Sequence, residues 1–350
     1  MGRYGRIEND DFLYDHLSVG VLTNSIYIDE YANGIAESLK ALGVKTIVYN
    51  SYDNVADQDV IIVFGPYLFK DSIKKRKKGT LYIAVCLEQY PSRKLGFTKR
   101  GTTMLLNERS VIGDYDMVFC WTREQVKILS KWHKNVHYLP YAISHEYCVD
   151  VEAQSLDENE KSFDIFFVGD TSSSQRRKEL LSFLSKKYNI CPQTEDIWGD
   201  DKYTKMRKSR ICLNLHQDWG RITEFPRLFE YAGNRCFILS EPMEESYPFI
   251  KGRDYDVFYW SNVCEKIDYY LENSEIRQRI SKSAYETSQS INTLDVAEII
   301  LEEIFTELYY KKYSKNYLIR ARDLLSSKIG FFESVKIVKN RLIILFKLKV

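Results

Sequence analysis

The sequence predicts an α/β protein made of two similar arrays, each a parallel sheet covered by helices on both faces. Short, nearly continuous apolar runs alternate with segments of helical periodicity, which is typical of parallel strands buried on both faces. The alternation stops at an acidic and polar stretch, residues 144–162, and restarts at Phe163. The length of 350 residues also fits two domains of ordinary size.

The first array is predicted over residues 1–143. Gly43 is expected to end the first helix, where Tyr31, Ile35 and Leu39 repeat at helical spacing. Strands are expected at 17–23, 44–49, 59–64, 81–86, 117–120 and 136–139, and further helices at about 67–77, 102–112 and 123–133.

The second array is predicted over residues 163–310. Thr223 is expected to cap a helix at 224–232, with Pro226 in its first turn and Gly233 at its end. Strands are expected at 163–168, 211–215 and 236–239, and further helices at about 175–187, 262–271, 275–289 and 293–310.

The charge of the chain is unevenly distributed. Residues 311–350 contain eleven Lys or Arg and two Asp or Glu, a net charge of +9, although the whole chain carries +1. Such a basic tail indicates an anionic partner, whereas the rest of the chain gives no reason to expect nucleic acid. The polar residues 1–16 do not resemble a signal peptide, and no run of 18 apolar residues predicts a membrane-spanning helix.

The cysteines indicate neither a disulfide framework nor a metal site. There are seven, at positions 86, 120, 148, 191, 212, 236 and 264, and none forms a CxxC pair. Buried free thiols in a reducing compartment are the simplest explanation, so a cytoplasmic location is expected. Asp114 and Asp116 have metal-ligand spacing, but they lead into a strand of the first array and are not expected to bind a metal.

A candidate phosphate-binding turn follows the first strand of the second array. Gly169 ends that strand, Ser172, Ser173 and Ser174 follow, and a helix begins with Arg176 and Arg177. Glycine lets backbone N–H groups approach an anion, a helix N-terminus adds positive potential, and arginines bind phosphate. The same pattern also fits an ordinary turn followed by solvated arginines.

A second candidate lies on the helix predicted at 224–232. The carboxylate of Glu230 suits the two hydroxyls of a ribose, but it also suits a surface ion pair with Arg227 one turn earlier. Asn214 and His216 end the preceding strand, and His216 either donates to a phosphate or simply completes the strand. All these loops leave the carboxyl ends of strands in one doubly wound sheet, where ligands bind.

These segments resemble the family of the spore maturation protein CgeB, within the GT-B glycosyltransferases. The resemblance rests on FDIFFVGDTSSSQRRKELLSFL at 163–184, SRICLNLHQ at 209–217 and PRLFEYAGNRCFILSEP at 226–242. It implies two Rossmann-like domains facing each other across a cleft. These would be an acceptor domain at 1–143, a linker at 144–162, a donor domain at 163–310 and a basic tail at 311–350, with the last helices returning to the first domain.

The resemblance also implies roles for individual residues. Glu230 occupies the position that holds the donor ribose, but the second Glu of many retaining members is Ile222 here, with Glu224 two residues away. Glu88 and Glu224 are the candidate catalytic carboxylates, and Asp29 and Glu30 are weaker candidates. Neither a cofactor nor a metal is expected, since GT-B enzymes mostly stabilise the leaving diphosphate with Arg, Lys and helix dipoles.

The function implied is a hexosyltransferase-like enzyme of surface polysaccharide or glycoconjugate synthesis. It would transfer a sugar from a nucleoside diphosphate sugar to a glycan or lipid-linked acceptor. The alternative is a non-catalytic nucleotide- or sugar-binding protein with the same fold, whereas an NAD-dependent enzyme is disfavoured because no GxGxxG follows either first strand. In the tail, residues 331–350 interleave apolar and basic residues, which predicts contact with an anionic membrane surface.

Overall fold

The computed structural model describes residues 17–25, 28–70, 76–88, 90, 98–148, 158–192, 199–217, 219–221 and 223–313. The chain divides into two compact units, residues 1–298 and 299–350. The predicted basic tail lies outside the described residues except for 311–313, whose backbone ends a helix. In the described part of the chain, no helix is long and apolar enough to cross a membrane.

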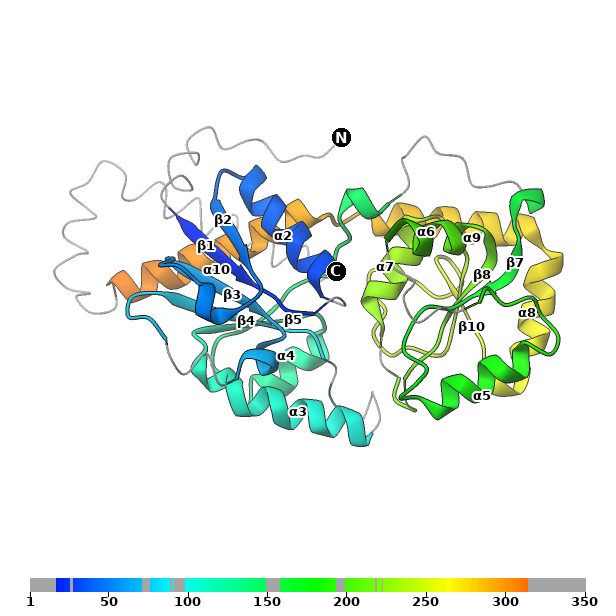
Figure 1. The fold of residues 1–350 in the computed structure, drawn as a ribbon, viewed down its shortest axis with the longest axis horizontal. Coiled ribbons are helices and arrows are strands. Elements are labelled where there is room, and N and C mark those ends of the chain that lie inside the picture. The colour runs from blue at the N-terminus through cyan, green and yellow to red at the C-terminus, as the bar shows by residue number, and fades with distance from the viewer. Residues whose placement is uncertain are drawn as a thin grey trace. The chain divides into compact units, whose positions relative to one another are not determined.

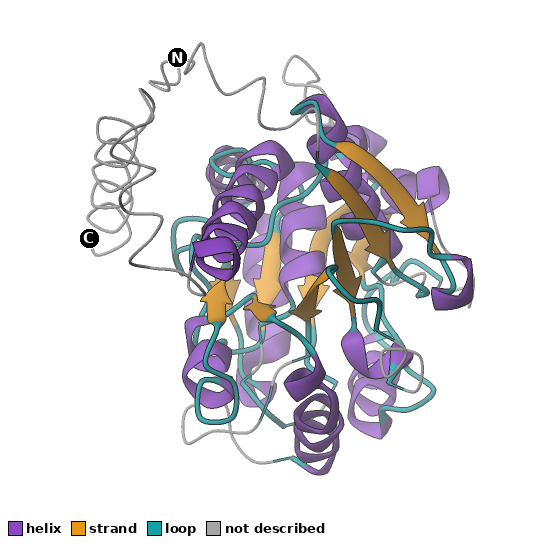
Figure 2. Cartoon of the chain, turned by 90° about the vertical axis from the view of Figure 1, so that its left-hand side faces the viewer, coloured by secondary structure: helices purple, strands orange, loops and turns teal. Residues whose placement is uncertain are grey.

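Among the described residues the first sheet has six strands, and each pairs in parallel with its neighbours in the order β2-β1-β3-β4-β5-β6. The strands lie between helices (Figure 2). Both β2 and β3 pair with β1, so the strand order reverses there. The strands are β1 (Ser18–Leu22), β2 (Lys45–Tyr49), β3 (Val60–Phe64), β4 (Leu81–Cys86), β5 (Met117–Cys120) and β6 (Val136–Tyr138).

The central strands are buried along their whole length. Every residue of β3, β4 and β5 is buried, which explains why these strands are continuous apolar runs and not alternating ones. All six predicted strands are therefore confirmed to within a residue at their ends.

The helices of the first array are α2 (Asp29–Ala41), α3 (Lys99–Val111) and α4 (Arg123–Leu129) (Figure 1). Gly43 has a φ of 85°, which confirms that it ends α2 through a left-handed conformation. The helix predicted at 67–77 is wrong in its first part, because Pro66–Phe69 form a short 3₁₀ helix, and residues 71–75 lie outside the described residues.

In the part of the chain that the structure describes, the second sheet has four parallel strands in the order β10-β9-β8-β7. Ile165 of β7 pairs with Ile211 of β8 and also forms a parallel bridge with Ile190. Strand β7 therefore has a neighbour on each side. The strand order of the second sheet reverses at β7, as the order of the first sheet does at β1. The strands are β7 (Phe163–Phe166), β8 (Ser209–Asn214), β9 (Ile238–Ser240) and β10 (Asp256–Val257), the last of which was not predicted.

Six helices complete the described part of the second array and the start of the following unit. They are α5 (Gln175–Leu184), α6 (Gly199–Arg207), α7 (Phe225–Gly233), α8 (Val263–Glu272), α9 (Ser274–Ser288) and α10 (Thr293–Tyr313). The sequence did not predict α6. Its segment is strongly polar and carries no clear apolar stripe.

The ends of α7 differ from the prediction. Glu224, not Thr223, is the N-cap residue, and the Thr223 hydroxyl instead donates to the carbonyl of Glu245. Gly233 is the last helical residue as predicted, but the left-handed residue beyond it is Arg235, with a φ of 53°. Gly233 serves close packing, because a Cβ there would lie 2.8 Å from Sγ of Cys148.

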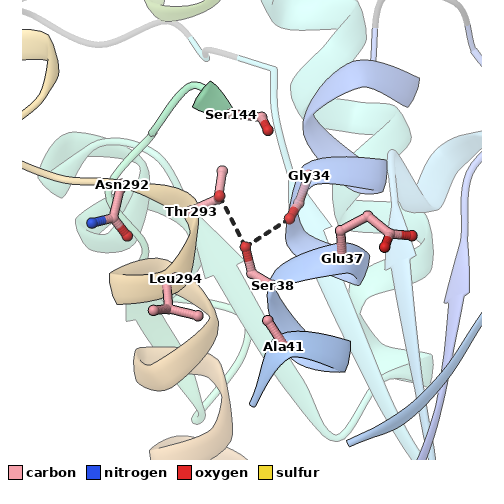
Figure 3. A pocket seen from close by; sticks show the side chains of 8 residues that line it. All are labelled: Gly34, Glu37, Ser38, Ala41, Ser144, Asn292, Thr293 and Leu294. Atoms are coloured by element: carbon pink, nitrogen blue, oxygen red, sulfur yellow. Dashed lines mark hydrogen bonds between the residues drawn. The ribbon is translucent and has the colours of Figure 1, made fainter. Parts of the chain in front are cut away.

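After α9 the chain returns to the first array. The hydroxyls of Ser38 on α2 and Thr293 at the start of α10 are hydrogen bonded at 2.9 Å (Figure 3). These residues line a pocket of about 320 Å³ together with Gly34, Glu37, Ala41, Ser144, Asn292 and Leu294 (Figure 3). None of the predicted site residues lines this pocket.

Candidate functional site

The candidate site lies at the carboxyl ends of β7 and β8. These paired strands flank the position where the order of the second sheet reverses. Ligands of doubly wound sheets bind at such a switch point. The turn after β7 contains Gly169, and the segment after β8 contains Leu215 and His216.

Gly169 is required by the close approach of an arginine. Its φ is +147°, which L side chains rarely adopt, and a Cβ there would lie 2.8 Å from Nη2 of Arg227. It would also lie 3.1 Å from the ring of Phe167 and 3.4 Å from Nη1 of Arg177. The glycine therefore leaves room for two guanidinium groups beside the turn.

The serine hydroxyls of the turn are hydrogen bonded within the protein. Ser172 donates to Asp170 at 2.7 Å, Ser173 also donates to Asp170, and Ser174 donates to the carbonyl of Gln217 at 2.6 Å. The hydrogen bond from Ser173 is the main reason why the pKa of Asp170 is lowered to about 2. Ser174 makes no side-chain cap for α5, so the backbone N–H groups of the first turn are the donors best suited to an anion.

Two buried arginines converge on the end of β8. Arg177 donates to the carbonyl of Leu215 at 2.7 Å, and Arg227 donates to the same carbonyl at 3.0 Å. Arg227 also donates to Oδ1 of Asn214 at 2.8 Å, and both guanidinium groups lie over the ring of Phe167. Burial, together with the charge of Arg227, lowers the pKa of Arg177 to about 10. This arrangement concentrates positive charge at the switch point.

One carboxylate lies beside these arginines. Glu224 Oε1 is 3.5 Å from Nη2 of Arg177, and its side chain is 28% exposed. Burial favours the neutral acid, but the charges of Arg227 and Arg177 outweigh it and lower the pKa of Glu224. Glu224 is therefore ionised at neutral pH.

Glu88 has the opposite electrostatic environment. Burial raises its pKa, the nearby charge of Glu224 raises it further, and Arg100 opposes both. Arg100 lies 3.8 Å from Glu88, and the hydroxyl of Tyr67 donates to it at 3.3 Å. Two carboxyl groups with pKa values shifted in opposite directions are a common arrangement in acid–base catalysis.

Glu230 is paired with a lysine that the sequence did not single out. Lys202 of α6 is 1% exposed, and its Nζ lies 3.1 Å from Glu230 and 3.5 Å from Glu30. The hydroxyl of Tyr203 also donates to Glu30, at 3.2 Å. Burial raises the pKa of Glu230, and Lys202 opposes this shift. The alternative interpretation, a surface ion pair between Glu230 and Arg227, is therefore wrong, because the partner of Glu230 is Lys202.

Arg176 differs from its predicted role as a phosphate ligand. Its guanidinium forms a two-pronged ion pair with buried Glu241, with one contact at 2.9 Å, and donates to the carbonyl of His216. Glu241 also accepts from the backbone N–H of His216 at 2.7 Å and from the indole of Trp260 at 2.9 Å. Arg176 thus links the start of α5 to Glu241 and to the segment after β8.

His216 and Asn214 complete the end of β8. Nε2 of His216 lies 3.0 Å from the carbonyl of Pro242, so Nε2 carries the proton, and burial lowers the pKa of His216. Nδ1 is then an acceptor, for which the described residues provide no partner. Asn214 donates to Ser240 at 2.9 Å and accepts from Arg227, which suits a structural role.

Three further residues bear on the predictions about a metal and about stereochemistry: Asp114, Asp116 and Ile222. Within the described ranges, no group of three or more His, Cys, Asp or Glu side chains could hold a metal ion. Asp116 instead accepts from Arg76 at 2.6 Å and from the backbone N–H of Tyr82 at 2.8 Å. Ile222, which stands where a second Glu was sought, lies outside the described residues.

Comparison with known proteins gives one family match and several similar solved structures. Residues 169–296 match a family model described as glycosyl transferase-like, whereas no curated protein matches the chain. An α-glucosyltransferase in complex with UDP-glucose and DNA superposes with a TM-score of 0.59 at 9% identity, over 83% of this chain and 99% of that one.

Two further solved structures are similar over most of their length. Sucrose-phosphate synthase from Thermosynechococcus elongatus has a TM-score of 0.58 at 11% identity, over 85% of this chain and 100% of that one. HepE from Anabaena, in complex with UDP and glucose, has a TM-score of 0.58 at 8% identity, over 83% of this chain and 100% of that one. These similarities show that the chain has the GT-B fold. The family match over residues 169–296 supports a glycosyltransferase.

Proposed function

We propose that the protein transfers a hexosyl group from a nucleoside diphosphate sugar to a glycan or lipid-linked acceptor in surface polysaccharide or glycoconjugate synthesis. The observation that carries this proposal is the pair of buried arginines, Arg177 and Arg227, at the switch point of the second sheet. Only one carboxylate, Glu224, forms an ion pair with either arginine among the described residues. A diphosphate carries the negative charge that would balance these two arginines, and its oxygens accept hydrogen bonds from guanidinium groups.

In this proposal the donor is bound by the two arginines, by the N-terminus of α5 and by Glu230. Arg177, Arg227 and the N-terminus of α5 bind the diphosphate, and Gly169 gives the arginines room to reach it. Glu230 accepts hydrogen bonds from the ribose hydroxyls. The cations and the helix dipole stabilise the charge that develops on the leaving diphosphate.

Glu88 and Glu224 are assigned to the acceptor hydroxyl and to the transferred sugar, respectively. Glu88, with its raised pKa, removes the proton from the attacking hydroxyl, and Glu224, ionised beside the arginines, binds hydroxyls of the transferred sugar. The alternative, a binding protein without turnover, shares the donor site but does not need Glu88. Complexes of solved neighbours contain UDP, UDP-glucose, glucose or DNA, which supports a uridine nucleotide as the first ligand to test.

The test is a thermal-shift titration with uridine, guanosine, thymidine and cytidine diphosphates. A diphosphate at about a hundred times its Kd should stabilise the fold by about 2.7 kcal/mol. Glu230→Gln should weaken that binding by about 1–3 kcal/mol, the range for a hydrogen bond to a charged group. Glu179→Gln, on the exposed face of α5, is the matched control. Absence of stabilisation by all four diphosphates would refute the donor site.

We also propose that residues 311–350 attach the enzyme to an anionic membrane surface. Support comes from the sequence of that segment alone, with its net charge of +9 and interleaved apolar residues. The full chain should sediment with anionic vesicles at low salt, and a chain ending at Lys328 should remain in solution. Equal sedimentation of the two would contradict the proposal.

A further inference from the structure

Trp219 is held on the surface beside the candidate donor site. Its side chain is 72% exposed, more than any other large hydrophobic side chain in the described residues. A large aromatic side chain in water gives up the stabilisation that burial would provide. An exposed indole ring that is held by specific contacts can bind a ligand on its free face.

Trp219 packs against groups that are themselves held by an ion pair and hydrogen bonds. The guanidinium of Arg176 lies 4.5 Å from the centroid of its ring and 5.1 Å from that of Trp260, and the two indole rings are 5.1 Å apart. Arg176 is fixed in turn by the ion pair with Glu241, whose carboxylate also accepts from the indole N–H of Trp260. A ring fixed in advance loses little conformational entropy when a ligand stacks on it.

Trp219 lies close to the turn after β7, where the diphosphate is proposed to bind. The carbonyl of Gln217, two residues before Trp219, accepts from Ser174, and the Gln217 amide donates to Ser173 at 2.7 Å. Two residues after Trp219, Arg221 pairs with Glu244. An exposed indole ring bordered by planar amide, guanidinium and carboxylate groups has the chemistry that recognises a carbohydrate ring, with its apolar face and its rim of hydroxyls.

We infer that Trp219 forms a subsite for a pyranose ring of the acceptor glycan, an inference that rests on the proposed glycosyltransferase function. The acceptor fits better than the donor sugar, because the transferred sugar must be shielded from water, whereas the Trp219 ring is largely exposed. Arg176 occupies one face of the indole, so the ligand stacks on the other, open face. The subsite binds acceptor beyond the reacting hydroxyl.

The test uses ¹⁹F NMR of the full chain labelled with 5-fluorotryptophan. The sequence contains five tryptophans, and the resonance lost in Trp219→Phe identifies the one of interest. Maltohexaose, cellohexaose and isomaltohexaose serve as probes. At least one should shift the Trp219 resonance, and Trp219→Ala should weaken that hexasaccharide's binding about tenfold while leaving the affinity for UDP unchanged.

Trp132 provides the matched control. It is 38% exposed and its ring also lies 5.0 Å from an arginine guanidinium, that of Arg109. It precedes β6, so it lies at the amino ends of the first sheet's strands, whereas ligands bind at the carboxyl ends. Trp132→Ala should leave hexasaccharide binding unchanged. The inference is overturned if no hexasaccharide shifts the Trp219 resonance, or if UDP alone shifts it, which would indicate a platform for the base. If the wild type binds UDP but no hexasaccharide, only the subsite is refuted and the proposed donor site stands. If the wild type does not bind UDP, the proposed function itself is contradicted.

Discussion

Glu88→Gln is expected to lower turnover by about 10²–10⁴-fold, the usual contribution of a general base. Glutamine preserves the shape of the side chain and can still accept the hydrogen bond from Tyr67, but it cannot take a proton from the acceptor. Affinity for UDP should stay at the wild-type value, because Glu88 belongs to the first array and the proposed diphosphate ligands to the second. Steady-state kinetics with a UDP-sugar, together with the UDP thermal shift, would separate the two effects.

The pH profile gives a second measure of the same residue. Burial raises the pKa of Glu88, and the group acts as a base only when ionised. Wild-type turnover should therefore fall as the pH decreases through a value above the ordinary pKa of glutamate, and Glu88→Gln should lack this acidic limb. Glu37→Gln, a largely exposed residue of α2, is the control. Wild-type turnover in Glu88→Gln would remove Glu88 from the mechanism.

The strands were predictable because burial leaves a direct mark on the sequence. Val60–Phe64 and Leu81–Cys86 are apolar throughout since both of their faces are covered. Helix α6 leaves no such mark, because its segment GDDKYTKMR is mostly polar. The two-residue strand β10 is likewise too short to produce a period.

The position of the candidate site was also predictable, but the partners of its charges were not. The order of turns identified the ends of β7 and β8, because parallel strands bring their carboxyl ends to one edge. Arg176 and Arg177 are adjacent in sequence, yet successive residues of a helix point about 100° apart. One therefore reaches Glu241 and the other Leu215, a distinction that depends on the tertiary structure.

Lys202 was not predicted either, because its partners are brought together only by the tertiary structure. Of the changes at the donor site, Lys202→Met should lower the stability of the fold most. The ammonium group lies between Glu30 and Glu230 and is almost completely buried. Methionine fills a similar volume but leaves two carboxyl groups without their cation. Removing one partner of a buried ion pair typically costs about 3–5 kcal/mol. We expect a decrease of that size in the free energy of unfolding, measured by urea denaturation at pH 7.

The pH dependence of Lys202→Met identifies the cause. Burial raises the pKa of Glu230, and loss of Lys202 removes the charge that opposes this shift. A carboxyl group whose folded-state pKa is raised stabilises the fold below its unfolded pKa, and this contribution is lost as the pH rises through the folded-state value. The variant should therefore be closest to wild type in mild acid and weakest at neutral pH. The double variant Lys202→Met, Glu230→Gln should recover stability, whereas Lys205→Met, one turn along α6 and paired with Asp201, should have little effect. Equal stability of the Lys202 and Lys205 variants would show that the buried ammonium group does not hold Glu230 in place.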